Sequence, residues 1–244
     1  MEAPSNRSAA ADQPSPDPGP QPETRKAVPR QFLFIVTYGR SGSTLLMKLV
    51  GAIDGYHIAG ENTNTVLGLC QSYLAVQETK QKFGRAPKGR DDPWFGAHLV
   101  RPNAFAKRLV NVFVDEVLRP PPEARVIGFK EIRYYEKPEF FRPQLEFMST
   151  FFTPAKFVFN VRNIDEVAKS GWWKDRSHEA VTRYITSFHR EMEAFMAAHP
   201  EQCFKVDYNE YTHDPASLSL LYEFLGEPFD LDNVTGVLSE KLTH

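Results

Sequence analysis

The sequence predicts an α/β fold of three layers, in which helices cover both faces of a central, mostly parallel β-sheet. Two observations lead to this prediction. Short runs that are apolar at nearly every position alternate with longer segments that are apolar at helical spacing, and such runs are typical of strands buried on both faces. The chain also has 244 residues, 41% of them hydrophobic, which is enough for one domain with its own core.

The first 30 residues differ from the rest of the chain. They contain seven of the 19 prolines and no Leu, Ile, Phe, Trp or Tyr. A segment of this composition buries too little apolar surface to offset the entropy lost on ordering. We therefore expect a disordered, proline-rich tail over residues 1–30 and one domain over residues 31–244.

The elements of this domain alternate along the chain. Phe32–Thr37 predicts a buried strand, and the residues from Ser43 to Ile53 are apolar at helical spacing. The patterns also predict strands at 126–130, 156–162 and 203–208, with a helix at 181–196. Asp214-Pro215 and Gly226 mark the start and end of a last helix. Strands alternating with helices imply a parallel sheet with right-handed crossovers.

Residues 54–125 interrupt this alternation. Two stretches are apolar at helical spacing, one around residues 66–74 and one around 105–113, and a connection rich in Gly and Pro separates them. We interpret this segment as a helical insertion that follows the first βα unit.

The composition excludes several classes of protein. Lys and Arg total 29 against 31 Asp and Glu, a formal charge of −2, which argues against a broadly basic nucleic-acid binder. Cys70 and Cys203 lie far apart, and the seven histidines show no paired spacing, so neither a disulfide framework nor a metal site is expected. The longest apolar run, Phe32–Thr37, is too short to span a bilayer. We expect a cytoplasmic protein without a membrane span.

The segment between the first strand and its helix reads Thr37-Tyr-Gly-Arg-Ser-Gly-Ser-Thr44. A turn of this kind directs backbone N–H groups and the positive end of the helix dipole toward one point, which favours an anion. The spacing differs from the GxxxxGK(S/T) loop of mononucleotide kinases and GTPases. The residues predicted to bind a phosphate are Gly39, Arg40, Ser41, Gly42, Ser43 and Thr44.

This loop resembles the 5′-phosphosulfate loop of sulfotransferases that use 3′-phosphoadenosine 5′-phosphosulfate (PAPS). That loop commonly reads Pro-(Lys/Arg)-Ser-Gly-Thr-Thr, and here Gly39 replaces the proline and Ser43 the first threonine. The resemblance implies a P-loop-like fold and transfer of a sulfuryl group from PAPS, leaving adenosine 3′,5′-bisphosphate. The insertion would then cover the acceptor.

Two further motifs support the resemblance. Arg162-Asn-Ile-Asp-Glu-Val-Ala-Lys-Ser170 is similar to the family's 3′-phosphate motif, with Ile164 in place of proline and with the aspartate either displaced by one position or replaced by Glu166. An arginine at the end of a strand and a serine eight residues later can converge on one phosphate. Val206-Asp-Tyr208 resembles a Val-x-Tyr-Glu segment, whose aromatic residue lies near the nucleotide. These motifs assign Arg162, Ser170 and Tyr208 to the donor.

Three residues are candidates for catalysis. Sulfuryl transfer needs a base for the acceptor proton and cations where negative charge accumulates. Arg40 and Lys130, at the end of a predicted strand, are the candidate cations. Gly60-Glu61-Asn-Thr63 resembles a segment of tyrosylprotein sulfotransferases whose glutamate is the proposed base. The motifs are most similar to the tyrosylprotein and carbohydrate branch, and His98 is the alternative base.

The predicted reaction is therefore in-line displacement by an acceptor hydroxyl, with a carboxylate base and no metal. The alternatives are a nucleotide-dependent P-loop kinase and a nucleotide-binding regulatory protein without catalytic activity. A small molecule, a carbohydrate and a tyrosyl peptide all remain open as acceptor, and the oligomeric state is open too. Trp172 and Trp173 either cover a ligand or pack in the core.

Overall fold

The computed structural model describes residues 30–239, and the predicted tail, apart from Arg30, lies outside them. Its centre is a five-stranded sheet in the order β2-β3-β1-β4-β5, in which every neighbouring pair is parallel. The strands are β1 (Gln31–Val36), β2 (Tyr56–Ala59), β3 (Val126–Glu131), β4 (Ala155–Val161) and β5 (Cys203–Asp207). This confirms the predicted α/β fold with a parallel sheet.

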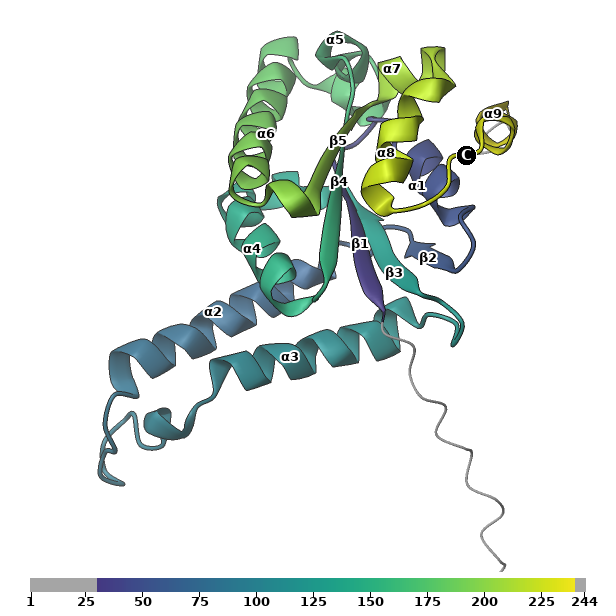
Figure 1. The fold of residues 1–244 in the computed structure, drawn as a ribbon. Helices are drawn as coiled ribbons and strands as arrows, with labels where there is room; N and C mark the ends of the chain where they lie inside the picture. The colour runs from purple at the N-terminus through teal and green to yellow at the C-terminus, as the bar shows by residue number, and fades with distance from the viewer. Residues whose placement is uncertain (1–29, 240–244) are drawn as a thin grey trace, which may run out of the picture.

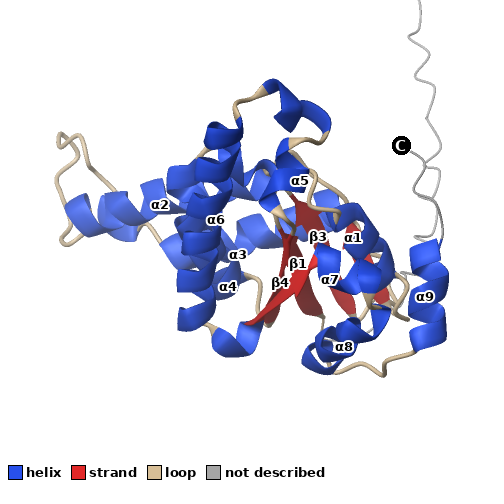
Figure 2. Cartoon of the chain, turned by 90° about the horizontal axis from the view of Figure 1, so that it is seen from above, coloured by secondary structure: helices blue, strands red, loops and turns tan. Residues whose placement is uncertain are grey.

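Helices cover both faces of the sheet (Figures 1 and 2), with α4 and α6 on one side and α1 and α8 on the other. The helices are α1 (Ser43–Gly51), α2 (Thr65–Phe83), α3 (Pro102–Phe113), α4 (Phe141–Phe151), α5 (Ile164–Ala168), α6 (His178–Ala198), α7 (Tyr208–His213), α8 (Ser219–Leu225) and α9 (Leu231–Ser239). The short helical segments are the π-helical η2 (Val114–Leu118), which continues α3, and the 3₁₀ segments η1 (Ala97–Leu99), η3 (Arg133–Glu136), η4 (Pro138–Phe140), η5 (Gly171–Asp175), η6 (Pro200–Gln202) and η7 (Pro215–Leu218).

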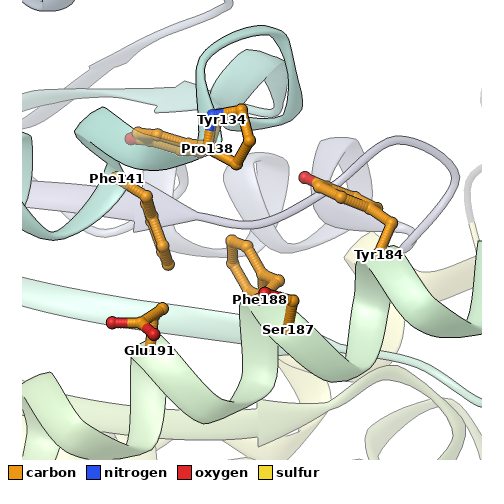
Figure 3. A pocket seen from close by; sticks show the side chains of 7 residues that line it. All are labelled: Tyr134, Pro138, Phe141, Tyr184, Ser187, Phe188 and Glu191. Carbon is orange, nitrogen blue, oxygen red and sulfur yellow. The ribbon is translucent and has the colours of Figure 1, made fainter.

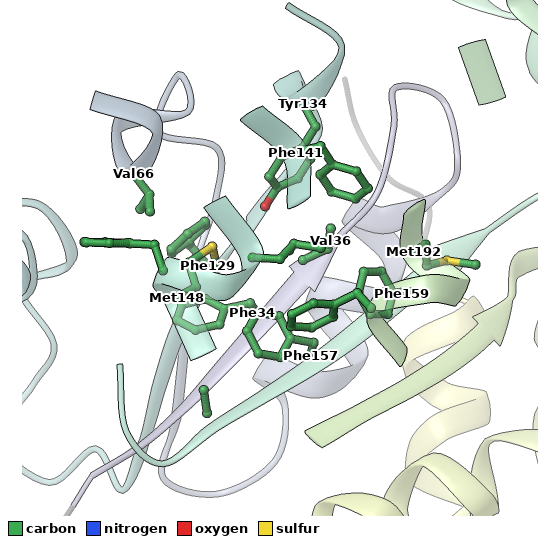
Figure 4. Close-up of a cluster of buried hydrophobic side chains, with 14 of the residues drawn as sticks. Phe34, Val36, Val66, Phe129, Tyr134, Phe141, Met148, Phe157, Phe159 and Met192 are labelled. Atoms are coloured by element: carbon green, nitrogen blue, oxygen red, sulfur yellow. The ribbon is translucent and has the colours of Figure 1, made fainter. Parts of the chain in front are cut away.

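The core consists of two clusters separated by the sheet. Successive side chains of a strand point to opposite faces, so in β1 Phe34 and Val36 join one cluster, whereas Leu33 and Ile35 join the other. Figure 4 shows the first cluster, in which side chains of β1, β3 and β4 meet those of α4 and α6. Burial on both faces explains why these strands are apolar at consecutive positions.

The segment predicted as a helical insertion also contains a strand. Residues 56–59 form β2, which pairs with β3 at the edge of the sheet. Only the residues after it form the helical hairpin of α2 and α3, which projects from the body in Figure 1. All four residues of β2 are only partly buried, so the strand lacks the continuous apolar run that marks β1. Among residues 30–239, no helix combines the length and apolar character that crossing a membrane requires.

The last predicted helix is divided in the structure. Asp214 accepts a hydrogen bond from the N–H of Ala216, and Pro215 begins the 3₁₀ turn η7 before α8 starts. Gly226 ends α8 with a left-handed φ of 80°, as expected for a glycine at this position.

Candidate functional site

The loop between β1 and α1 is held by hydrogen bonds to β4. Thr37 Oγ1 donates to the carbonyl of Asn160 at 2.6 Å, and Asn160 Nδ2 donates to the carbonyl of Ser41 at 2.8 Å. Arg40 and Gly42 adopt left-handed φ values of 66° and 82°, which turn the chain sharply before α1 begins. The first N–H groups of α1 have no side-chain cap, so the start of this helix is suited to an anion.

Aromatic rings pack closely on two glycines of this loop. A Cβ atom on Gly39 would lie 2.3 Å from the ring of Trp172, and one on Gly42 would lie 2.0 Å from the ring of Tyr208. Trp173 is buried behind the loop, where its indole N–H donates to the carbonyl of Gly39 at 2.9 Å. Both glycines are therefore needed for the rings to approach the backbone.

An open cavity of about 310 Å³ lies at the carboxyl ends of the strands, next to this loop. It brings together residues from segments that are far apart in the sequence. Its walls are formed by Arg40, Gly42, Ser43, Thr44, Glu61, Lys130, Ile132, Arg162, Trp172 and Tyr208. Ligands of open α/β sheets bind at this edge.

Three predicted donor-binding residues do not line the cavity. Gly39 lies under Trp172, and the hydroxyl of the fully buried Ser41 shares a hydrogen bond of 2.8 Å with Thr37. Ser170 contacts the cavity wall through Arg40, whose Nε donates to the serine Oγ at 3.0 Å. The hydroxyl of Ser41 therefore stabilises the loop.

Arg162 is fixed from three sides at the end of β4. Its guanidinium donates to Glu166 Oε2 at 2.9 and 2.7 Å and to the carbonyl of Arg40 at 3.2 Å. It also lies over the ring of Tyr208, with Cζ 4.4 Å from the ring centroid. The hydrogen bonds from Arg162 hold the pKa of Glu166 below its usual value. The guanidinium is thereby oriented before any ligand arrives.

The two candidate catalytic residues opposite the loop form an ion pair. Lys130 Nζ lies 2.5 Å from Glu61 Oε1. The lysine side chain is 6% exposed, whereas that of Glu61 is 30% exposed. The structure therefore places a buried cation beside a carboxylate that solvent and a substrate can reach.

The sequence matches a model of a known protein family over most of its length. The sequence model of the sulfotransferase family matches residues 32–231. The chain belongs to the sulfotransferase family. This sulfotransferase has no match among curated proteins.

Solved structures show the same fold. The structure is similar to a sulfotransferase domain from the olefin synthase of Synechococcus PCC 7002, with a TM-score of 0.58 and 18% identity over 88% of this chain and 80% of the other. It is also similar to a sulfotransferase domain from the curacin biosynthetic pathway, with a TM-score of 0.52 and 15% identity over the same shares. At sequence identities this low, the similarity shows that the chain shares the P-loop-like fold of these domains.

Glu131, which the sequence analysis did not single out, connects two segments of the cavity wall. Its carboxylate is completely buried and accepts four backbone hydrogen bonds. Oε2 accepts from the N–H groups of Asn62 at 3.2 Å and Asn64 at 2.7 Å, and Oε1 accepts from those of Ile132 at 2.8 Å and Arg133 at 3.0 Å. Glu131 thus joins the loop that carries Glu61 to the end of the strand that carries Lys130.

The alternative base, His98, lies elsewhere. It belongs to η1, which packs on the C-terminal end of α2, and Lys80 donates a hydrogen bond of 2.5 Å to its carbonyl. Helix α2 has 19 residues, so its ends are roughly 28 Å apart, and the cavity lies near its N-terminal end. No histidine is among the residues that line the cavity.

A second, much smaller cavity lies between α6 and the turns that precede α4 (Figure 3). Its volume is about 20 Å³, room for a single water molecule. The hydroxyls of Tyr134 and Tyr184, which line it, are buried without a hydrogen-bond partner. The volume and the two unpartnered hydroxyls suit a buried water better than a substrate.

Proposed function

We propose that this protein transfers a sulfuryl group from PAPS to an acceptor hydroxyl by in-line displacement. The observation that carries the proposal is the Lys130–Glu61 pair, which shares one cavity with the anion-binding loop after β1. A cation, a reachable carboxylate and a phosphate-binding loop are the groups that this reaction needs at one place.

The residues of the cavity fit a donor with two phosphate groups. The start of α1 with Arg40, Ser43 and Thr44 would hold the 5′-phosphosulfate. Arg162 would bind the 3′-phosphate, and Ser170 would support this contact. Tyr208, which lies beside both Gly42 and Arg162, offers an aromatic face to the nucleotide.

The proposed chemistry gives each catalytic residue one role. The acceptor oxygen forms a bond to sulfur while the bond from sulfur to the bridging phosphate oxygen breaks, and the acceptor proton passes to Glu61. Arg40 stabilises the charge that develops on the leaving phosphate, and Lys130 stabilises that on the sulfuryl oxygens. These cations serve the displacement without a metal. The products are a sulfate ester and adenosine 3′,5′-bisphosphate.

The acceptor in this proposal is defined by its hydroxyl, which must reach the exposed side of Glu61. Small molecules, carbohydrates and tyrosyl peptides all carry such a group. A screen of these three classes with PAPS labelled in the sulfuryl group identifies the acceptor, and labelled product from none of them would contradict catalysis and favour a regulatory nucleotide-binding protein.

The donor is tested separately by thermal stabilisation. Two phosphate sites imply that adenosine 3′,5′-bisphosphate raises the melting temperature more than AMP or ATP does at equal concentration. At a hundredfold excess over its dissociation constant, a ligand adds about 2.7 kcal/mol to the stability. Equal stabilisation by AMP would refute the 3′-phosphate site, and a preference for ATP would favour a kinase.

A further inference from the structure

The hairpin of α2 and α3 ends in a turn that lies far from the sheet. Figures 1 and 2 both show this end as the part of the described chain that projects furthest from the body. Residues 84–101 connect the two helices, and we call them the apex. Three large apolar side chains are exposed there, Trp94 at 41%, Phe95 at 56% and Leu99 at 70%.

The apex is ordered by its own contacts. Trp94 stacks on Phe83 at the end of α2, with ring centroids 3.6 Å apart and planes inclined by 3°. The N–H of Trp94 donates to Asp92 at 2.7 Å, and the same carboxylate accepts from Lys88 at 3.2 Å. These contacts fix the turn while one face of the indole and the two neighbouring apolar side chains remain in solvent.

The apex is also positively charged, although the whole chain is slightly acidic. The apex itself contains four basic residues, Arg85, Lys88, Arg90 and Arg101, and two acidic ones, Asp91 and Asp92. Lys88 is paired with Asp92. Lys80 and Lys82, in the adjoining last turn of α2, add two positive charges, of which Lys82 is paired with Glu78.

We propose that the apex is a peripheral membrane-binding site for a bilayer surface rich in anionic phospholipids. A Trp, a Phe and a Leu exposed together can enter the boundary between headgroups and acyl chains, where aromatic side chains are favoured. Lysines and arginines around them attract the negative surface potential of such a leaflet. Both features are required because a few apolar side chains alone bind a bilayer weakly.

This surface is separate from the cavity proposed for sulfuryl transfer. The apex lies at the C-terminal end of α2, whereas the loop with Glu61 precedes the N-terminal end of this helix. Membrane binding at the apex would leave the cavity open to donor and acceptor. Membrane binding at the apex can therefore be tested independently of the proposed reaction.

Co-sedimentation with vesicles tests the proposal. The full chain should sediment with vesicles containing phosphatidylserine, and much less with vesicles of phosphatidylcholine alone. Combining Arg85→Glu with Arg90→Glu should weaken binding about 30-fold or more, since each basic residue contributes about 1 kcal/mol near an anionic surface. Combining Phe95→Ala with Leu99→Ala should weaken it about tenfold or more.

Matched controls use residues with similar exposure on other elements. Arg183→Glu with Arg190→Glu changes two exposed arginines of α6, and Leu220→Ala changes an exposed leucine of α8. These variants should bind vesicles like the parent. Equal sedimentation with both kinds of vesicle, or apex variants that bind like the controls, would overturn the proposal. The proposal would also be overturned if the parent associated with itself in the absence of lipid and the apex variants did not. The partner of the apex would then be a second copy of the chain.

Discussion

Arg40 and Ser170 are 130 residues apart in the chain, yet the guanidinium Nε of one donates a hydrogen bond of 3.0 Å to the hydroxyl of the other. The bond joins the loop after β1 to the segment after α5. Gly171, with a left-handed φ of 56°, makes room for the arginine, since a Cβ there would lie 2.9 Å from Arg40 Cδ. The two segments assigned to the two phosphates of the donor are therefore directly connected.

The first prediction compares Arg162→Ala with Ser170→Ala. A charge-assisted hydrogen bond contributes about 1.5–3 kcal/mol, against about 0.5–1.5 kcal/mol for a neutral one. Binding of adenosine 3′,5′-bisphosphate, measured by calorimetry, should therefore weaken about 10- to 150-fold in the arginine variant and about 2- to 10-fold in the serine variant. Arg183→Ala, on the exposed face of α6, is the control. Parental affinity in both variants would refute the 3′-phosphate assignment.

The second prediction concerns Glu61→Gln, which keeps the shape of the side chain and removes its basic oxygen. General-base catalysis contributes about 10²- to 10⁴-fold, so turnover should fall by that factor. Affinity for adenosine 3′,5′-bisphosphate should change little. Glu78→Gln, at an exposed position of α2, should behave like the parent. A Glu61→Gln variant with nearly full turnover would show that another group takes the proton.

The third prediction concerns Glu131→Gln. An amide in place of the carboxylate turns an NH₂ group toward backbone N–H donors, and a buried donor without a partner costs about 1–3 kcal/mol. Turnover should decrease at temperatures well below melting, because the loop with Glu61 loses its attachment to β3. Bisphosphate affinity should change less than twofold, since the donor-binding residues lie on other segments. A variant that is less stable but has parental turnover would limit Glu131 to a structural role.

The fourth prediction uses two glycines at the ends of α1. In Gly42→Ala the new methyl group meets the ring of Tyr208, and φ is positive. Strain of this kind costs about 1–3 kcal/mol, so the melting temperature and the bisphosphate affinity should both fall. Gly51→Ala is the matched control, because nothing lies within 4 Å of a Cβ there. Equal behaviour of the two variants would contradict the close contact with Tyr208.

The fifth prediction concerns pH and Glu227. Arg125 donates two hydrogen bonds to this carboxylate, at 2.6 and 2.8 Å, and with Tyr56 it holds the pKa of Glu227 below its usual value. Because the pKa of Glu227 is lower in the folded protein than in the unfolded chain, its ionised form stabilises the fold. This stabilisation is fully present at pH values above the ordinary pKa of a glutamate, and it is lost as the pH falls through the lowered pKa of the folded state.

Urea unfolding at several pH values measures this contribution. At pH 7, Glu227→Gln should be less stable than the parent by about 1 kcal/mol, a modest value because Arg125 is partly exposed and screened by solvent. The difference should shrink on acidification below pH 4.5. A difference that does not depend on pH would show that the charge of Glu227 contributes nothing.

The sequence predicted the central strands β1, β3 and β4 because they are buried on both faces and therefore apolar at most positions. The same logic could not find β2, an edge strand with partly buried side chains that pairs with β3 alone. Helices α2 and α3 were predicted from their spacing, but not that they project together as a hairpin.

The parts of the candidate site that lie within one short segment of the sequence could be predicted from the spacing of its residues. The glycine loop between β1 and α1 and the position of Arg162 at the end of β4 are visible in the sequence because a strand and a helix flank them. The ion pair of Lys130 with Glu61 depends on segments 69 residues apart. Glu131 was missed because its four partners are backbone N–H groups. Every residue except proline carries such a group, so the sequence does not show which of them a carboxylate will bind.

The strand order also has a consequence for folding. Strand β1, the first of the five to be synthesised, lies between β3 and β4, which begin about 95 and 125 residues later in the chain. Pairing over such separations is slow, and a chain still emerging from the ribosome cannot complete the cavity before β4 and Arg162 have been made. Tyr208 follows later still. We therefore expect the ability to bind a nucleotide to appear late in refolding, after the helices have formed. Nucleotide binding would then report that the sheet is complete.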